Sequence, residues 1–156
     1  MKLQNSVVTT GQELFINFTG FFMYTMKKVC EMTGLTYETL KFYCNKGLVP
    51  NVKRGENNYR VFDDRDVEWI KGLNCLKNCG MGINEMLAYT EMCLEGQSTI
   101  PQRKKMLDEK KALLLRERRT IDECLFYIDE KQKFYDDVTA GKTPYVSNLL
   151  PRGVNK

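Results

Sequence analysis

The sequence contains no histidine, the most common acid–base group in catalysis. Its absence excludes the Ser–His and Cys–His nucleophilic pairs and every metal site that needs an imidazole ligand. No two of the six cysteines have the CxxC spacing of zinc ribbons and redox motifs. A glycine-rich loop of the kind that cradles phosphate is missing as well. We therefore expect a protein that is not an enzyme and that has no metal and no cofactor.

Long apolar runs are also missing. No stretch approaches the roughly 20 residues that cross a bilayer, and no secretory signal is visible. We therefore expect a cytoplasmic protein with free thiols and no membrane partner. The composition, 42% hydrophobic and 28% charged, is ordinary for a globular chain of 156 residues.

The net charge of +4 is too small to identify a nucleic-acid partner by itself. Its distribution is more informative. Residues 36–62 contain five Lys or Arg side chains and only two acidic ones. Residues 99–136, in contrast, carry both signs in near balance, as the surface of a solvated helix does. The excess positive charge is therefore concentrated in one short part of the chain.

Start and stop signals predict two short helices in residues 25–44. Thr25 is a good N-cap for a helix that ends at Gly34, and Thr36 caps a second helix that ends just before Gly47. Residues 51–62 then form a basic hairpin with a Gly-Glu-Asn-Asn tip. Two helices followed by a hairpin are typical of a winged helix-turn-helix, which places its second helix in the DNA major groove.

Two further helices complete a predicted DNA-binding domain of residues 23–95. Asp63 or Asp64 caps the first of them, in which apolar residues recur at three-residue steps, and Gly80 ends it. Residues 83–94 form the second. The predicted fold is therefore mainly α, with a small β-hairpin as its wing.

The last predicted element is a long helix over residues 99–136, with a capping-box pattern at Thr99 and Gln102. Apolar residues recur there at seven-residue steps, which is the signature of a left-handed coiled coil. At about 1.5 Å per residue this helix would be on the order of 55 Å long, too long for the small domain to cover. We therefore expect a homodimer, and a tail of residues 137–156 too short to form a domain. The predicted dimerisation residues are Leu107, Leu114, Ile121, Cys124, Leu125, Ile128 and Tyr135.

Residues 1–22 do not fit this pattern. A polar stretch is followed by an aromatic cluster that Asn17, Thr19 and Gly20 interrupt. The leading interpretation is an N-terminal extension, either a tag remnant or a misassigned start, with Met23 as the natural beginning. The alternative is a strand or a helix that packs on the core or on a second subunit.

Several segments together resemble the mercury-resistance-regulator (MerR) family of bacterial transcription regulators. They are residues 24–29 (YTMKKV), 33–43 (TGLTYETLKFY), 46–50 (KGLVP), 58–62 (NYRVF), 64–67 (DRDV) and 79–86 (CGMGINEM). The resemblance implies a homodimer that binds a pseudo-palindromic operator in double-stranded promoter DNA. It also implies that the protein distorts the spacer DNA, so that RNA polymerase is reached indirectly, through the promoter. Residues 93–107 are further similar to the short subgroup that responds to aldehyde or thiol stress.

The chain departs from the family pattern at several places. The family usually has Arg at Lys41, commonly Glu at Cys44, and Gly at Asn58, although Asn also tolerates a left-handed backbone. The metal-sensing branch has a cysteine at the start of the dimer helix, where this chain has Ile100, and more beyond its end, where this chain has none. We therefore expect no metal sensing through the familiar site.

Short polar residues at the start of a groove helix reach base edges, and cations beside them hold phosphates. Phe42 or Tyr43 faces inward beside Leu40. We expect Phe42 to pack in the core, and for Tyr43 both core packing and a phosphate contact stay open. The predicted DNA-binding residues are Thr25, Thr36, Tyr37, Thr39, Lys41, Tyr43, Lys53, Arg54, Asn58, Tyr59 and Arg60.

Two cysteines are candidate effector thiols. Cys44 lies among lysines, which favour a reactive thiolate, and Cys93 lies near a helix end just before the dimer helix. Cys75 and Cys79 share one helix face and are better explained as small core residues. An alternative function is a small-molecule or multidrug sensor whose aromatic pocket at the dimer helix is lined by Tyr127, Phe134, Tyr135 and Tyr145.

Overall fold

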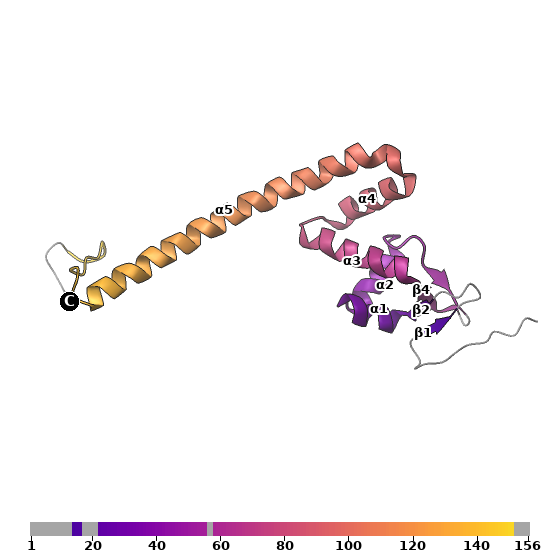
Figure 1. The fold of residues 1–156 in the computed structure, drawn as a ribbon, viewed down its shortest axis with the longest axis horizontal. Coiled ribbons are helices and arrows are strands. Elements are labelled where there is room, and N and C mark those ends of the chain that lie inside the picture. The colour runs from indigo at the N-terminus through magenta and orange to yellow at the C-terminus, as the bar shows by residue number, and fades with distance from the viewer. Residues whose placement is uncertain (1–13, 17–21, 56–57, 152–156) are drawn as a thin grey trace, which may run out of the picture. The chain divides into compact units, whose positions relative to one another are not determined.

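The computed structural model describes residues 14–16, 22–55 and 58–151. It confirms the mainly α fold class, with a small sheet and a long C-terminal helix (Figure 1). Its elements are β1 (Leu14–Ile16), β2 (Phe22–Thr25), α1 (Met26–Thr33), α2 (Tyr37–Asn45), β3 (Lys53–Arg54), β4 (Arg60–Phe62), α3 (Asp64–Asn78), α4 (Ile83–Glu95), the 3₁₀ turn η2 (Gln97–Thr99) and α5 (Ile100–Thr139).

The helix-turn-helix forms where the caps predict it. The side-chain oxygen of Thr25 accepts a hydrogen bond from the N–H of Lys28, and α1 ends at Gly34, whose φ of 71° is left-handed. Thr36 caps α2 in the same way as Thr25 caps α1. Because only three residues separate α1 from α2, the second helix is held at a fixed angle to the first.

The sheet is antiparallel and has the strand order β1-β2-β4-β3. Leu14 pairs with Tyr24, and Thr25 pairs with Val61 of the wing. The predicted boundary between residues 22 and 23 therefore falls inside β2. Backbone pairing ties residues 14–16 and 22 to the sheet, which favours the alternative interpretation of a strand for these residues. Whether residues 1–22 are an added extension stays a prediction. Residues 1–13 and 17–21 lie outside the described residues.

One core joins the helix-turn-helix to the wing and to α3. Buried side chains from α1, α2, β4 and α3 meet there, among them Val29, Leu40, Phe62 and Ile70. The indole N–H of Trp69 in α3 also donates to the carbonyl oxygen of Leu48, at 2.7 Å, in the loop that follows α2. The second helix of the motif is thus held by its buried face and by the loop that follows it.

The start of α5 differs from the prediction. The Thr99 hydroxyl lies within hydrogen-bond distance of the carbonyl oxygens of Met92 and Gly96, and it does not cap α5 by accepting a backbone N–H. The predicted capping box with Gln102 is therefore wrong. Because η2 runs directly into α5, its residues already supply the carbonyl groups that the first turn of α5 needs.

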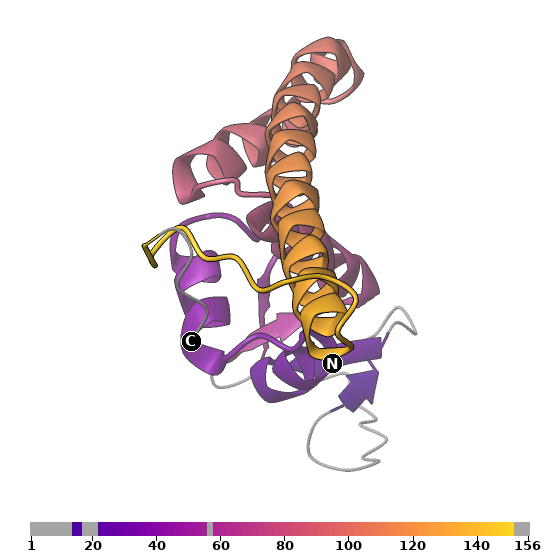
Figure 2. The ribbon, with the colours of Figure 1, turned by 90° about the vertical axis from the view of Figure 1, so that its left-hand side faces the viewer.

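The chain divides into two compact units, residues 1–110 and 111–156, and α5 passes from one into the other. Figures 1 and 2 show α5 as one continuous helix. Within the first unit, Lys110 of α5 donates to the Glu85 carboxylate at 2.8 Å and to the Gly80 carbonyl at 3.1 Å. None of the forty residues of α5 is buried. In the described part of the chain, no helix is long and apolar enough to span a membrane.

Candidate nucleic-acid interface

The N-terminus of α2 presents small polar groups at the surface. Thr36 accepts a hydrogen bond from the N–H of Thr39 at 3.2 Å, and the two hydroxyls lie 2.8 Å apart. Tyr37, which follows the cap, is exposed. This end of the helix carries free N–H groups and a partial positive charge, so it suits a negatively charged or hydrogen-bonding partner. Thr25, in contrast, is half-buried and already serves as the N-cap of α1.

The adjacent aromatic residues Phe42 and Tyr43 of α2 differ in burial from the prediction. Tyr43 is 2% exposed and lies in the core, whereas Phe42 is 41% exposed. The prediction of Tyr43 as a phosphate contact is therefore wrong, as is the assignment of Phe42 to the core. The Tyr43 hydroxyl is buried and has no hydrogen-bond partner among the described residues, and burial raises the pKa of this phenol.

Cations flank the exposed face of α2. Lys41 is exposed, and its ammonium lies 3.9 Å from the Glu38 carboxylate, a distance typical of weak surface pairs. The ammonium of Lys46 lies 5.7 Å from the centre of the Phe42 ring, in cation–π geometry. Both cations remain accessible to a phosphate.

The wing tip is shaped by backbone hydrogen bonds. The N–H of Gly55 donates to the Tyr59 carbonyl, and the Arg54 guanidinium donates to the Asn58 carbonyl at 2.8 Å. Asn58 has a φ of 62°, the left-handed conformation expected where the family has Gly. Tyr59 is exposed beside these groups, so the tip presents an aromatic ring and a cation together.

Arg60 connects the wing to α2. Its guanidinium donates to the side-chain oxygen of Asn45 at 2.6 Å, and Asn45 is the last residue of α2. From the sequence, Arg60 is expected to contact DNA, and Asn45 is not among the predicted site residues. Since the two residues are far apart in the chain and belong to different elements, no spacing pattern predicts this pair.

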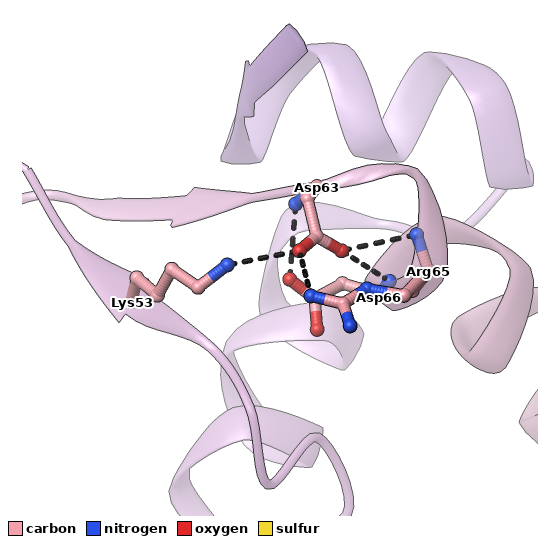
Figure 3. Close-up of polar contacts among 4 residues, drawn as sticks. All are labelled: Lys53, Asp63, Arg65 and Asp66. Atoms are coloured by element: carbon pink, nitrogen blue, oxygen red, sulfur yellow. Dashed lines mark hydrogen bonds and ion pairs between the residues drawn. The ribbon is translucent and has the colours of Figure 1, made fainter. Parts of the chain in front are cut away.

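Lys53 is held by an acidic group at the start of α3. Its ammonium lies 2.8 Å from Asp63, whose carboxylate also accepts from the Arg65 guanidinium at 3.0 Å (Figure 3). Burial alone would raise the pKa of the Asp63 carboxyl, but the hydrogen bonds from Lys53, Arg65 and the N–H of Asp66 lower it well below its ordinary value. Asp63 is therefore charged whenever the protein is folded near neutral pH. The sequence predicted Asp63 as a helix cap but not as a partner of the wing.

The two candidate thiols have different surroundings. Burial raises the pKa of Cys44, and this effect outweighs the opposing charges of Arg60 and Arg54. The prediction that positive charge activates Cys44 is therefore wrong. Cys93 is half-buried, and the guanidinium of Arg103 lies 3.5 Å from its sulfur. Arg103 also donates to Thr99 and to the Gly96 carbonyl, so Arg103 links Cys93 to the turn that joins α4 to α5.

Aromatic residues also gather at the end of α5. The ring centroids of Phe134 and Tyr135 are 5.6 Å apart, and those of Phe134 and Tyr145 are 6.4 Å apart. Tyr127 lies apart from them, with the ammonium of Lys131 over its ring. The aromatic pocket of the alternative function stays a prediction.

A helix-turn-helix that is tied to a basic hairpin defines the class of winged-helix DNA-binding proteins. The family described as MerR HTH family regulatory protein matches residues 24–91. A relative from Haemophilus influenzae, an uncharacterized HTH-type transcriptional regulator, is 32% identical over 117 residues, 75% of this chain and 87% of the relative. The chain belongs to the MerR family of HTH-type transcriptional regulators.

Two further similarities agree with this assignment. The transcriptional regulator AdhR of Bacillus subtilis is 38% identical over 88 residues, which are 56% of this chain and 63% of AdhR. The crystal structure of HiNmlR, a MerR family regulator lacking the sensor domain and bound to promoter DNA, superposes with a TM-score of 0.67 at 32% identity. That match covers 76% of this chain and 89% of HiNmlR. These relatives are transcriptional regulators and not enzymes, and this chain is likewise a DNA-binding transcriptional regulator.

Proposed function

We propose that this regulator acts as a homodimer that binds a pseudo-palindromic promoter operator and distorts the spacer DNA in response to a thiol-stress or small-molecule signal. The observation that carries the proposal is that the wing is tied to the C-terminal end of α2, a helix whose N-terminus is exposed, and that a long helix without buried residues follows. The first part reads DNA, and the second requires a partner.

The partner that fits α5 best is a second copy. Its apolar side chains at seven-residue steps, Leu107, Leu114, Ile121, Ile128 and Tyr135, are between 38% and 57% exposed. A continuous apolar stripe of this length is unfavourable in water. Because the stripe has the period of a coiled coil, an identical helix covers it in matching layers.

On the DNA, we assign base-edge contacts to Thr36, Tyr37 and Thr39 and backbone contacts to Lys41 and the wing. Short polar side chains at a helix N-terminus reach base edges, whereas exposed cations beside them hold phosphates. The match to a family member that was crystallised on promoter DNA supports this assignment.

Distortion of the operator follows from stiffness. The pairs Arg60–Asn45 and Lys53–Asp63 tie the wing to α2 and α3, so each DNA-binding domain of the dimer is rigid. Operator DNA whose half-sites do not match the separation of two rigid domains must bend or untwist, which costs roughly 1–6 kcal/mol for smooth bends. Such a distortion would alter the spacing of promoter elements that RNA polymerase reads.

For the signal, Cys93 is a better candidate than Cys44. An electrophile that forms a bond to its sulfur would remove the contact with Arg103 at the α4–α5 turn. Cys44 packs against the core, and this burial raises the pKa of its thiol, which lowers the fraction of reactive thiolate. The resemblance of residues 93–107 to the thiol-stress subgroup supports the same choice.

The test is a footprint on the DNA that flanks the coding region, combined with energy transfer between dyes at the two ends of the protected fragment. The wild-type protein should protect two half-sites and shorten the end-to-end distance, and acetaldehyde or hydrogen peroxide should alter that distance. Absence of any protected site on this DNA counts against the proposal.

The same assay separates the thiols. Cys93→Ser should abolish the response to electrophile and leave the footprint intact, while Cys75→Ser, at an exposed cysteine of α3, is the matched control. A full response in Cys93→Ser and in Cys44→Ser rejects thiol modification as the signal and leaves the small-molecule alternative.

A further inference from the structure

The outer strand of the wing is short. β3 contains only Lys53 and Arg54, and it lies at the edge of the sheet. It pairs with β4 through Lys53–Val61 and Arg54–Arg60 alone. Because this ladder has only two residue pairs, contacts outside it also contribute to the position of Lys53.

Asp63 provides such a contact, and its own position is fixed. One carboxylate oxygen accepts from the Lys53 ammonium at 2.8 Å and from the Arg65 guanidinium at 3.0 Å. The other accepts from the backbone N–H groups of Arg65 and Asp66, at 3.0 and 3.1 Å. The Asp63 N–H donates in turn to the Asp66 carboxylate, at 3.0 Å. Figure 3 shows all of these groups converging on Asp63.

The Asp63 carboxylate holds Lys53 and Arg65 and leaves most of their N–H donors available for another partner. Lys53 has three N–H donors and Arg65 has five, and each directs a single side-chain donor at Asp63. The side chains of Lys53 and Arg65 are 47% and 87% exposed, whereas that of Asp63 is 11% exposed. The cluster therefore presents two cations at the surface and keeps the acid behind them.

We propose that Asp63 is a positioning residue for DNA binding, which fixes Lys53 and Arg65 as neighbouring phosphate contacts at the base of the wing. Long cationic side chains lose conformational entropy when they bind phosphate, and ordering them beforehand reduces that loss. Arg65 thereby joins the interface, although no sequence signal pointed to it. The inference rests on the proposed contact between the wing and the DNA backbone.

The direction in which operator affinity changes when the Asp63 charge is removed separates a positioning role from simple electrostatic repulsion. Removing a negative charge beside a polyanion should strengthen binding if charge alone matters. Loss of positioning should weaken binding instead. We expect Asp63→Asn to lower operator affinity about tenfold and to reduce the slope of log affinity against log salt by about one unit, as loss of an ordered phosphate contact does.

The matched control is Asp64→Asn. It removes the same charge from the next residue, which is exposed and accepts a hydrogen bond from the Tyr24 hydroxyl at 2.7 Å that Asn can also accept. We expect affinity in Asp64→Asn to be unchanged or slightly higher. Equal or tighter binding in Asp63→Asn, with an unchanged salt slope, overturns the inference.

Folding is checked independently. Asn and Ser both cap helices well, so Asp63→Asn and Asp63→Ser should keep the start of α3 and a cooperative thermal transition. Affinity should fall in both, because neither side chain binds two cations as a carboxylate does. If Asp63→Asn does not fold, Asp63→Ser carries the measurement.

A double-mutant cycle distinguishes failure of this inference from failure of the proposed function. Lys53→Gln should weaken binding in the wild type and should have little further effect in Asp63→Asn. An equal effect of Lys53→Gln in both backgrounds overturns positioning by Asp63 and leaves the wing contact intact. No effect of Lys53→Gln in the wild type removes Lys53 from the phosphate contacts and overturns this inference, while Arg60→Ala tests the rest of the wing.

Discussion

The unit that contains the helix-turn-helix and the part of α5 beyond Lys110 use apolar residues in opposite ways. In the first, side chains such as Val29, Leu40 and Ile70 are almost completely buried. In the second, Leu114, Ile121 and Ile128 remain exposed on a helix with no buried residue. Both regions contain similar residue types, so composition alone does not separate them.

The two regions differ in whether their apolar side chains are buried within the same unit. The first buries a core from several short elements, which is how a small domain becomes stable by itself. An isolated helix owes little of its stability to intrinsic propensity and most of it to the packing of an apolar face. The exposed apolar seam of α5, which consists of Leu107, Leu114, Ile121, Ile128 and Tyr135, therefore lacks the packing that the proposed second copy would supply. The first unit, in contrast, buries its own core and is a finished domain.

The largest predicted effect tests that contrast directly. Leu114→Glu places a charge in the seam, and we expect loss of the dimer at micromolar concentration and a fall of at least about 100-fold in operator affinity, since both half-sites can no longer be bound together. Sedimentation and a binding titration measure the two effects.

The control for this change lies on the other side of the same helix. Ala112→Glu adds the same charge two residues away, off the seven-residue seam, and should leave the dimer and the affinity unchanged. If Leu114→Glu remains a dimer with normal operator affinity, the seam of α5 is not the dimer interface and its exposed apolar residues have another role.

Within the finished domain, Arg60 tests whether the wing binds by charge or by anchoring. Arg60→Ala should weaken binding to all DNA sequences about tenfold and flatten the salt slope by about one unit, if the guanidinium contacts phosphate. Asn45→Ala removes its partner in α2 and leaves the cation in place. An unchanged slope in Arg60→Ala removes this residue from the phosphate contacts, and equal losses in both variants assign the effect to anchoring.

The sequence predicted the parts of the fold that depend on local signals. Thr25 and Thr36 cap their helices as expected, and the left-handed Gly34 and Asn58 stand where turns require them. Each of these features is decided within three or four residues. The boundaries of α3 and α4 followed for the same reason.

What the sequence could not predict depends on packing between distant segments. Phe42 and Tyr43 are neighbours with similar side chains, and only the angle of α2 against the core decides which of them is buried. The partners Arg60–Asn45 and Lys53–Asp63 lie 15 and 10 residues apart across a hairpin. At Thr99 a good local pattern failed, because the preceding turn η2 made a side-chain cap unnecessary.

A smaller effect concerns the stability of the finished domain in acid. The pKa of Asp63 is lowered in the folded protein from 3.8, so its contribution is complete above about pH 5 and is lost as the pH falls toward the folded value. The difference in unfolding free energy between wild type and Asp63→Asn should be about 1–2 kcal/mol near neutral pH and should shrink between pH 4 and pH 2. Asp66, whose pKa burial raises, acts in the opposite direction and is present in both proteins. A gap that stays constant over this range contradicts the ion pairs of Asp63.

The smallest effect concerns the one place in the described part of the finished domain where a buried side-chain oxygen lacks a partner. Tyr43→Phe removes the buried hydroxyl and keeps the ring in the core. Because an unsatisfied buried hydroxyl is unfavourable, we expect an increase of about 1 kcal/mol in unfolding free energy, with operator affinity unchanged. Denaturant unfolding and a binding titration measure both. A loss of affinity in Tyr43→Phe without loss of stability would return the Tyr43 hydroxyl to the DNA interface and require α2 to shift on binding.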